Sequence, residues 1–195
     1  MTMLRLAILI SGRGSNMESI LQAAEAEDYP LEPALVLSNR PNAAGLKIAE
    51  GMGIQTKSVD HTLFGKDREA FEVAMHVALK ESKIDIIALA GFMRILTPWF
   101  VNKWVGRLVN IHPSLLPKYP GLNTHQRAID AGDAHAGCSV HWVTEGVDEG
   151  QVIDQAKVAI ATGETAASLA EKILPLEHAL YPVALAKAAR QITPR

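Results

Sequence analysis

The sequence predicts an α/β protein with a doubly wound, mostly parallel sheet, helices on both faces, an antiparallel C-terminal strand extension and a closing helix. Short apolar runs at 6–10, 33–37 and 84–90 alternate with segments of helical periodicity, as in proteins built from β/α repeats. Runs that are apolar throughout are typical of parallel strands buried on both faces. Two later strand-like segments, 137–144 and 152–160, are joined by so short a turn that they must run antiparallel.

Length and composition indicate one soluble globular domain over residues 1–195. The chain is 48% hydrophobic and 21% charged, with a net charge of -2, and a domain of this size buries about 70% of its unfolded surface. A near-neutral charge argues against broad nucleic-acid binding, and no apolar run approaches the ~18 residues that span a bilayer. We expect a cytoplasmic protein, monomeric or homodimeric, that binds neither nucleic acid nor membrane. The single cysteine, Cys138, is expected to be a small buried core residue.

The first strand runs into a glycine-rich turn. The apolar run at 6–10 is followed by Ser-Gly-Arg-Gly-Ser-Asn at 11–16, and apolar residues at 17–24 then recur at helical spacing. Such a turn presents free backbone N–H groups at a helix N-terminus, where an anion is favoured. A third glycine for a dinucleotide and a Gly-Lys-Ser/Thr for a nucleoside triphosphate are both lacking, so a monophosphate fits best. The alternative is a plain helix start, with Ser15 and Glu18 spaced as a capping box.

The next segments continue the alternation of strand and helix. They predict strands at 33–37, 54–59 and 84–90 and helices at 44–52 and 67–81. The loop from Gly91 to Pro98 follows the carboxyl end of a strand, the edge at which open α/β sheets bind ligands. A packing loop is the alternative there.

The central stretch is 108–121, where an apolar strand ends in a rigid turn that carries three prolines. Asn110 and His112 are two residues apart, so on an extended backbone their side chains project from the same face of the strand and can bind one small group together. Alternatively, His112 bonds only a neighbouring backbone group. Sequence does not decide whether an X-Pro bond in this turn is cis.

The last third of the chain predicts a helix, two strands around an acidic turn, and a closing helix. These segments are 124–131, 137–144, 145–150, 152–160 and 165–189. Pro175 and Pro182 should kink or restart the closing helix. Asp148 lies in the acidic turn, where the common role of an aspartate is to bond its own backbone.

Five segments resemble the folate-dependent formyltransferases, most closely those that act on phosphoribosylglycinamide. They occur in the family's order over nearly the whole chain: Gly-Arg-Gly-Ser-Asn at 12–16, Gly-Phe-Met-Arg-Ile-Leu at 91–96, Asn-Ile-His-Pro-Ser-Leu-Leu-Pro-Lys-Tyr-Pro-Gly at 110–121, His-Trp-Val-Thr-Glu-Gly-Val-Asp-Glu-Gly at 141–150 and Glu-His-Ala-Leu-Tyr-Pro at 177–182. One departure is Gln151, where many members carry proline. It bears on the shape of the Asp148 turn.

The resemblance implies transfer of the formyl group of 10-formyltetrahydrofolate, a co-substrate, to the amine of glycinamide ribonucleotide in purine synthesis, without a metal. It implies catalytic residues Asn110, His112 and Asp148; phosphoribosyl-binding residues Gly14, Ser15, Asn16 and Glu177; and folate-binding residues Arg68, Met93, Arg94, Ile95, Leu96 and Asn110. The N-terminal half would then bind the phosphate, and the C-terminal half would bind folate and carry the catalysis. Otherwise Arg68 and Glu177 are solvated surface charges.

Formyl transfer requires an oxyanion to be stabilised and a proton to be moved. Asn110 offers a neutral N–H donor and a protonated His112 a charged one, both aimed at the oxyanion. Asp148 can accept the proton that leaves the amine, directly or through a water.

Three other functions compete with this hypothesis. Methionyl-tRNA formyltransferase would carry a further C-terminal domain, and formyltetrahydrofolate deformylase usually has an N-terminal regulatory one; we expect neither here. Water as the acceptor would also leave the phosphate loop without a purpose. A non-catalytic phosphosugar-binding module of the same fold class is the third. Convergence of Asn110, His112 and Asp148 on one small volume distinguishes an enzyme from such a module.

Overall fold

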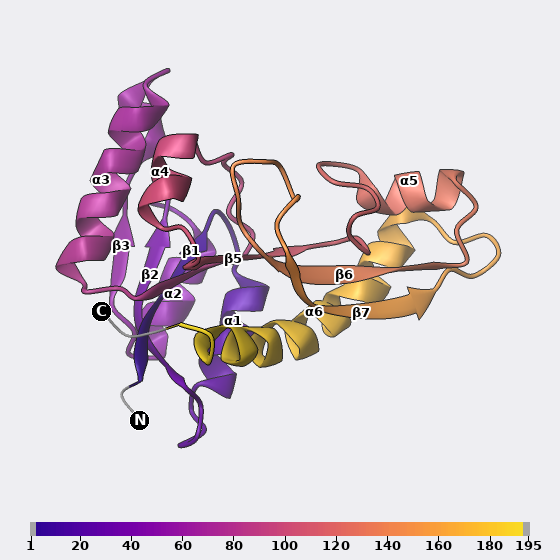
Figure 1. Ribbon diagram of the computed structural model, residues 1–195, viewed down its shortest axis with the longest axis horizontal. Coiled ribbons are helices and arrows are strands. Elements are labelled where there is room, and N and C mark those ends of the chain that lie inside the picture. Colours follow the sequence, from indigo (N-terminus) through magenta and orange to yellow (C-terminus); the bar gives the residue numbers. More distant parts are fainter. Residues whose placement is uncertain (1–2, 193–195) are drawn as a thin grey trace.

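The computed structural model describes residues 3–192, and a seven-stranded sheet runs through this part of the chain (Figure 1). The strands are β1 (Leu4–Ile10), β2 (Leu31–Ser38), β3 (Thr56–Ser58), β4 (Ile86–Leu89), β5 (Leu108–His112), β6 (His135–Trp142) and β7 (Val152–Ala159). Their order across the sheet is β3-β2-β1-β4-β5-β6-β7. The chain therefore starts in the middle of the sheet and winds outward in both directions, as the doubly wound prediction requires.

The sheet changes character at β5. In the part of the sheet with the order β3-β2-β1-β4-β5, all neighbouring strands are parallel. By contrast, β5 pairs with β6, and β6 with β7, in the antiparallel sense. The predicted antiparallel extension is confirmed, and it joins the parallel part directly through β5. In the β5/β6 register Asn110 lies opposite His141, and His112 opposite Ser139.

Helices cover both faces of the sheet. They are α1 (Ser15–Ala23), α2 (Ala44–Gly51), α3 (Arg68–Glu81), α4 (Pro98–Lys103), α5 (Thr124–Asp130) and α6 (Ala166–Ala189), with a 3-10 turn, η1 (His61–Phe64). Neither α4 nor η1 was predicted, because each is too short to show a helical period in the sequence. In α4, a proline in the first turn and the buried side chains of Phe100 and Val101 stabilise the short helix against the sheet.

Two hydrophobic cores lie on opposite faces, and the strands supply both. In β1, Leu6 and Ile8 face one core, which includes residues of α1, α2 and α6, while Ala7 and Leu9 face the other, which includes residues of α3 and α4. All four of these side chains are fully buried. A strand with no polar face can be stable only between two layers of helices, which explains its continuously apolar sequence. Cys138 is buried in the first core as expected, and burial raises the pKa of its thiol to about 12.

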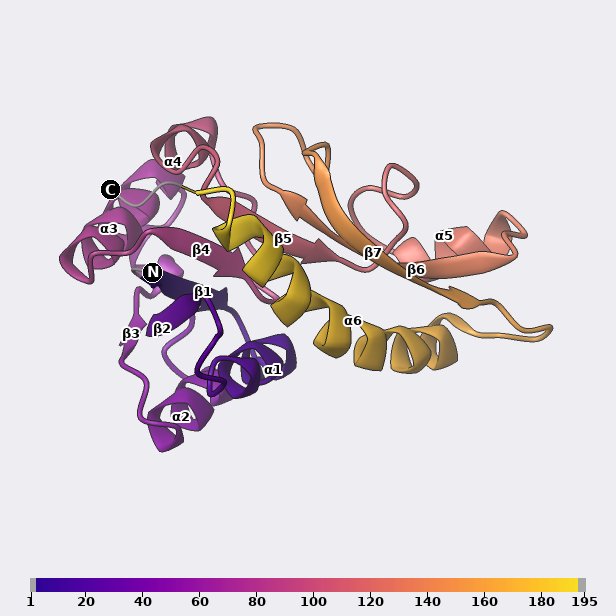
Figure 2. The same cartoon turned by 60° about the horizontal axis from the view of Figure 1, so that its bottom comes forward.

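The closing helix α6 is a single helix despite its two internal prolines. It begins at a capping box in which Thr165 and Ser168 satisfy each other's backbone N–H groups. Pro175 and Pro182 both lie inside it, and Figure 2 shows it changing direction along its length. The helix is therefore bent and not restarted. Between residues 3 and 192, no helix has the length and hydropathy needed to cross a membrane.

Tyr181 fixes α6 to the centre of the sheet. Its side chain is fully buried, and its hydroxyl lies 3.0 Å from the carbonyl oxygens of both Leu89 and Val109. We expect Tyr181→Phe to lower the free energy of unfolding by about 1–3 kcal/mol, because a buried carbonyl then loses its donor. Urea denaturation measures this, with Tyr29→Phe as the control. The Tyr29 hydroxyl also bonds a carbonyl but is only partly buried, so an equal or larger loss in the control would contradict the assignment.

Candidate active site

Loops after β1, β4 and β5 meet at one edge of the sheet, because these three neighbouring strands are parallel. Ser11 ties the first loop to the second. Its backbone N–H donates to the Gly91 carbonyl (3.1 Å), and its Oγ accepts from the N–H of Met93 (2.8 Å) while donating to Asn39 Oδ1 (2.5 Å). Ser11 and Asn39 are both buried. The glycine-rich loop and the 91–98 loop are thus held in a fixed relation.

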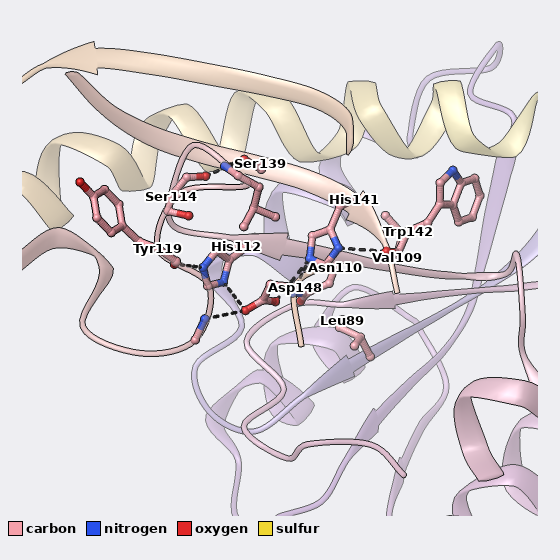
Figure 3. A network of polar contacts seen from close by, with 12 residues as sticks. Leu89, Val109, Asn110, His112, Ser114, Tyr119, Ser139, His141, Trp142 and Asp148 are labelled. Atoms are coloured by element: carbon pink, nitrogen blue, oxygen red, sulfur yellow. Dashed lines mark hydrogen bonds and ion pairs between the residues drawn. The ribbon is translucent and has the colours of Figure 1, made fainter. Parts of the chain in front are cut away.

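Three predicted catalytic residues converge at the end of β5 (Figure 3). Asn110 and His112 lie on that strand, and Asp148 reaches them from the loop between β6 and β7. His112 Nδ1 lies 3.3 Å from Asp148 Oδ2, and the side chains of His112 and Asp148 are only 7% and 13% exposed. A pair so withdrawn from water interacts more strongly than a surface ion pair.

His141 connects Asn110 to Asp148. Its Nδ1 lies 3.0 Å from the carbonyl oxygen of Trp142, which can only accept, so Nδ1 carries a proton. Its Nε2 lies 3.2 Å from Asn110 Nδ2 and 3.5 Å from Asp148 Oδ1. In its neutral form His141 therefore accepts a hydrogen bond from Asn110 and fixes the direction of that amide. This orientation follows from the antiparallel register that sets the two residues opposite each other.

The Asp148 carboxyl is held as a carboxylate. Its burial acts to raise the pKa, but the hydrogen bond from the Gly121 N–H, the contact with the His141 ring and the positive charge that His112 and His141 carry when protonated outweigh burial and lower it. The Gly121 N–H donates to Asp148 Oδ2 at 2.9 Å. Asp148 itself has a φ of 56°, a left-handed conformation that costs energy for a residue other than glycine. The loop is thus folded to deliver this side chain, and Asp148 does more than bond its own turn.

His112 faces hydrogen-bond acceptors at both ring nitrogens. Nε2 lies 2.9 Å from the Tyr119 carbonyl oxygen, and Nδ1 faces the Asp148 carboxylate. Only a doubly protonated imidazolium can donate to both. The possibility that His112 bonds a backbone group is correct for one nitrogen, while the other belongs to the Asp148 pair. The Leu116–Pro117 bond in the same turn is cis.

The glycine-rich loop leads into α1, and the N-terminus of this helix has the backbone geometry that a phosphate site requires. Gly14 is the N-cap, with a φ of 78°, and no side chain caps the helix. A left-handed N-cap favours glycine, and the absence of a side-chain cap leaves the first N–H groups of α1 for a ligand. Ser15 is already inside the helix, so the capping box with Glu18 does not form.

Asn16 and Glu177 meet beside this loop. Asn16 Nδ2 donates to Glu177 Oε2 at 2.7 Å, although the two residues are 161 positions apart in sequence. Glu177 is therefore no freely solvated charge. Burial raises the pKa of its carboxyl, and the bond from Asn16 opposes that effect only in part.

We expect Glu177→Gln to stabilise the protein at neutral pH. A glutamate whose pKa is raised by folding destabilises the folded state as pH rises from its ordinary pKa of 4.5 through the folded-state value. An uncharged amide can still accept the Asn16 N–H without that cost. The free energy of unfolding should therefore be higher in the variant at pH 7 and equal to wild type below pH 4.5. A variant that is less stable at pH 7 would contradict the burial argument.

Arg68 lies beside the 91–98 loop, as the folate hypothesis expects. Its guanidinium donates to the carbonyl of Ile95. The side chains of Met93 and Ile95 are 70% and 69% exposed, while Arg94 and Leu96 are partly covered. Two exposed aliphatic side chains on a loop at the ligand edge offer an apolar surface for a flat ring.

Residues 4–185 match the family model described as formyl transferase. The chain belongs to the formyl transferase family. Among solved structures, phosphoribosylglycinamide formyltransferase from Brucella melitensis superposes on this formyl transferase with a TM-score of 0.92 and 48% identity, covering 98% of each chain. The fold prediction is thereby confirmed.

Relatives of this formyl transferase include proteins of similar length and a much longer trifunctional protein. Phosphoribosylglycinamide formyltransferase of Escherichia coli is 42% identical over 182 residues, covering 93% of this chain and 85% of the relative. The human trifunctional purine biosynthetic protein adenosine-3 is 44% identical over 181 residues. This chain spans 18% of the length of that human protein.

Some residues of the formyl transferase site carry no predicted role. His141 lies in a segment that resembles the family, but its contact with Asn110 depends on the β5/β6 register, which was not predicted. Gly45, at the start of α2, donates its N–H to the Gly12 carbonyl at 3.0 Å, and a Cβ there would lie 2.9 Å from the Arg13 carbonyl oxygen. A glycine at a helix start was the available sequence signal for this close approach.

Proposed function

We propose that this chain transfers the formyl group of 10-formyltetrahydrofolate to the amine of glycinamide ribonucleotide in purine biosynthesis. The observation that carries the proposal is the convergence of Asn110, His112 and Asp148 at the end of β5, within a family of formyl transferases. A phosphosugar-binding module has no need of such a buried group of charged and donor side chains. The names of the Escherichia coli and Brucella melitensis relatives support the choice of acceptor.

In the proposed mechanism the substrate amine attacks the formyl carbon, and negative charge develops on the formyl oxygen. Asn110 is the proposed oxyanion donor. Its amide nitrogen carries two N–H groups, and His141 takes only one of them. Since the direction of the amide is already fixed, no reorganisation is needed when charge develops.

Asp148 is the proposed proton acceptor. The attacking amine acquires a positive charge and must lose a proton before the C–N bond to the folate can break. A carboxylate with a lowered pKa is ionised at neutral pH and can take this proton directly or through a water. The same proton, or one from the same water, then neutralises the departing folate nitrogen.

His112 is proposed to supply positive charge beside the oxyanion. Both of its nitrogens already have partners, the Tyr119 carbonyl and Asp148. Direct donation to the oxyanion therefore requires Nε2 to leave the Tyr119 carbonyl. Without that movement, His112 acts through its charge and by orienting Asp148.

For binding, we propose one domain in which the loop after β1 holds the phosphate through Gly14, Ser15 and Asn16. Glu177 would face the ribose from α6, since it bonds Asn16. The folate would lie along the 91–98 loop, at Met93, Arg94, Ile95 and Leu96, with its ring edge near Asn110. Arg68 would pair with a carboxylate of the folate tail, for which its bond to Ile95 positions it.

The decisive experiment incubates the purified chain with 10-formyltetrahydrofolate, with and without glycinamide ribonucleotide, and follows tetrahydrofolate by absorbance and formylglycinamide ribonucleotide by chromatography. Tetrahydrofolate release that depends on the ribonucleotide, with product in equal amount, is the expected result. Release without the ribonucleotide would indicate a deformylase instead. Tight ribonucleotide binding without any release would favour a non-catalytic module.

A further inference from the structure

One short loop holds both members of the His112 and Asp148 pair. The Tyr119 carbonyl accepts from His112 Nε2 at 2.9 Å, and the N–H of Gly121, two residues later, donates to Asp148 Oδ2 at 2.9 Å. Figure 3 shows the contact between Tyr119 and His112 beside Asp148. A shift of this loop would therefore move the acceptor of one residue and the donor of the other together.

The loop is fixed from outside by the side chain of Tyr119. In Figure 3 the Tyr119 ring points away from His112 while its backbone carbonyl faces it. The Tyr119 hydroxyl donates to Asp133 Oδ2 at 2.8 Å, and the guanidinium carbon of Arg127 lies 5.2 Å from the centre of the Tyr119 ring. A guanidinium at this distance from an aromatic face is attracted to it.

Arg127 and Asp133 also bind the loop directly. Arg127 Nη1 donates to the Pro120 carbonyl at 2.6 Å and lies 3.3 Å from the Leu122 carbonyl oxygen. Asp133 accepts from Lys118 Nζ at 2.8 Å. The residues before and after Tyr119 are therefore bound by the side chains of Asp133 and Arg127. Among the contacts described for residues 3–192, neither of these two side chains touches His112 or Asp148.

The backbone of the loop needs such support. Tyr119 has a φ of 56°, a left-handed conformation that is unfavourable for a residue with a Cβ. Such a conformation persists only when the surroundings impose it. The carbonyl direction that His112 uses is set by this φ, so the side-chain contacts that hold Tyr119 also set the position of the His112 acceptor.

We infer that Tyr119, Arg127 and Asp133 form a positioning clamp that sets the geometry of the His112 and Asp148 pair through the Tyr119 carbonyl and the Gly121 N–H. The expected effect of the clamp on turnover rests on the proposed function. Its effect on the positions of His112 and Asp148 does not. None of the three clamp side chains contacts the reacting atoms, so they are positioning residues. A misplacement of about 1 Å at a catalytic pair can cost about 100-fold in rate.

Two substitutions loosen the clamp to different degrees. Tyr119→Phe removes only the hydroxyl bond to Asp133, and Arg127→Gln removes the charge over the ring and the Nη1 group that contacts two carbonyls. We expect kcat to fall about 3 to 10-fold in Tyr119→Phe and about 10 to 100-fold in Arg127→Gln, while KM for each substrate changes less than about 3-fold. Arg127→Lys, which keeps the charge but not the planar guanidinium over the Tyr119 ring, should recover part of the loss.

Two NMR measurements on the free protein test the geometry without any turnover. The imidazole ¹⁵N and ¹H signals of His112 report its bond to the Tyr119 carbonyl, and the ¹³C signal of the Asp148 carboxyl reports its titration. Loss of the Gly121 donor should raise the pKa of Asp148 in both variants, with His112 and His141 as the other titratable groups that face it. Thermal denaturation establishes that each variant is folded.

Lys57→Gln is the matched control. It removes a surface cation whose Nζ lies 2.8 Å from Glu81, far along the sheet at β3, and should change neither turnover nor the NMR signals. Unchanged His112 and Asp148 signals in a folded Arg127→Gln would overturn the clamp, even if activity fell. If wild type showed no transfer at all, the proposed function would fail, and the NMR signals would still decide whether the clamp exists.

Discussion

Replacing Asp148 by asparagine is expected to lower kcat for formyl transfer by about 100 to 10,000-fold, the range that a proton-transferring group typically contributes. Asparagine has nearly the same shape and can still accept the Gly121 N–H through its oxygen. It cannot take the proton from the substrate amine. It also removes the negative charge that His112 Nδ1 faces at 3.3 Å, so His112 loses this partner at the same time.

Single-turnover measurements with both substrates saturating test this expectation, because they report the transfer step itself. Glu149→Gln is the control, since Glu149 is an exposed carboxylate on the same loop. It should retain wild-type kcat. An Asp148→Asn enzyme within about 5-fold of wild type would remove Asp148 from the proton-transfer role.

The Asp148→Asn variant should also differ from wild type in its pH-dependent stability. Folding lowers the pKa of Asp148 below its ordinary value of 3.8, so its ionisation stabilises the folded state above pH 3.8. That contribution is lost as pH falls through the folded-state pKa. The difference in unfolding free energy between the two proteins should be full at neutral pH and disappear in strong acid.

Asn110→Ala is expected to lower kcat by about 100 to 1,000-fold, the typical cost of removing one oxyanion donor. The effect should fall on kcat more than on KM, because the bond to the formyl oxygen is strongest when that oxygen carries negative charge. His141 loses its amide partner in this variant but keeps its bond to the Trp142 carbonyl.

Gln55→Ala supplies the comparison for this variant. Gln55 carries an exposed side-chain amide next to β3, at the far edge of the sheet, so an amide is removed away from the site. Its kcat should match wild type. A change in KM alone on Asn110→Ala, with kcat preserved, would assign Asn110 to folate binding and not to the oxyanion.

The parts of the fold that the sequence could predict are those encoded locally. Buried parallel strands are apolar throughout, so the run at 6–10 and the run at 84–90 were visible without any tertiary information. The glycine-rich turn after the first strand and the proline-rich turn after 108–112 were visible for the same reason, because each needs residue types with special backbone geometry.

The parts that could not be predicted depend on which segments become neighbours. His141 orients Asn110 only because β6 pairs with β5 in one particular register. Pairing between strands far apart in the chain leaves no local pattern. Tyr119 gave no sign of its role either, since its carbonyl contacts His112 while its ring is held by Arg127 and Asp133. A residue that acts through its backbone carbonyl cannot be recognised from the chemistry of its side chain.

The hydrogen bond between Asn16 and Glu177 joins residues that the ribosome adds early and late in synthesis. The proposed ribonucleotide site is therefore incomplete until α6 has docked on the rest of the molecule. A ligand that binds only the completed site stabilises only the fully folded chain, by an amount that grows with its free concentration. The cellular concentration of glycinamide ribonucleotide would then influence how long newly made molecules of this protein survive proteolysis. This effect would not depend on catalysis.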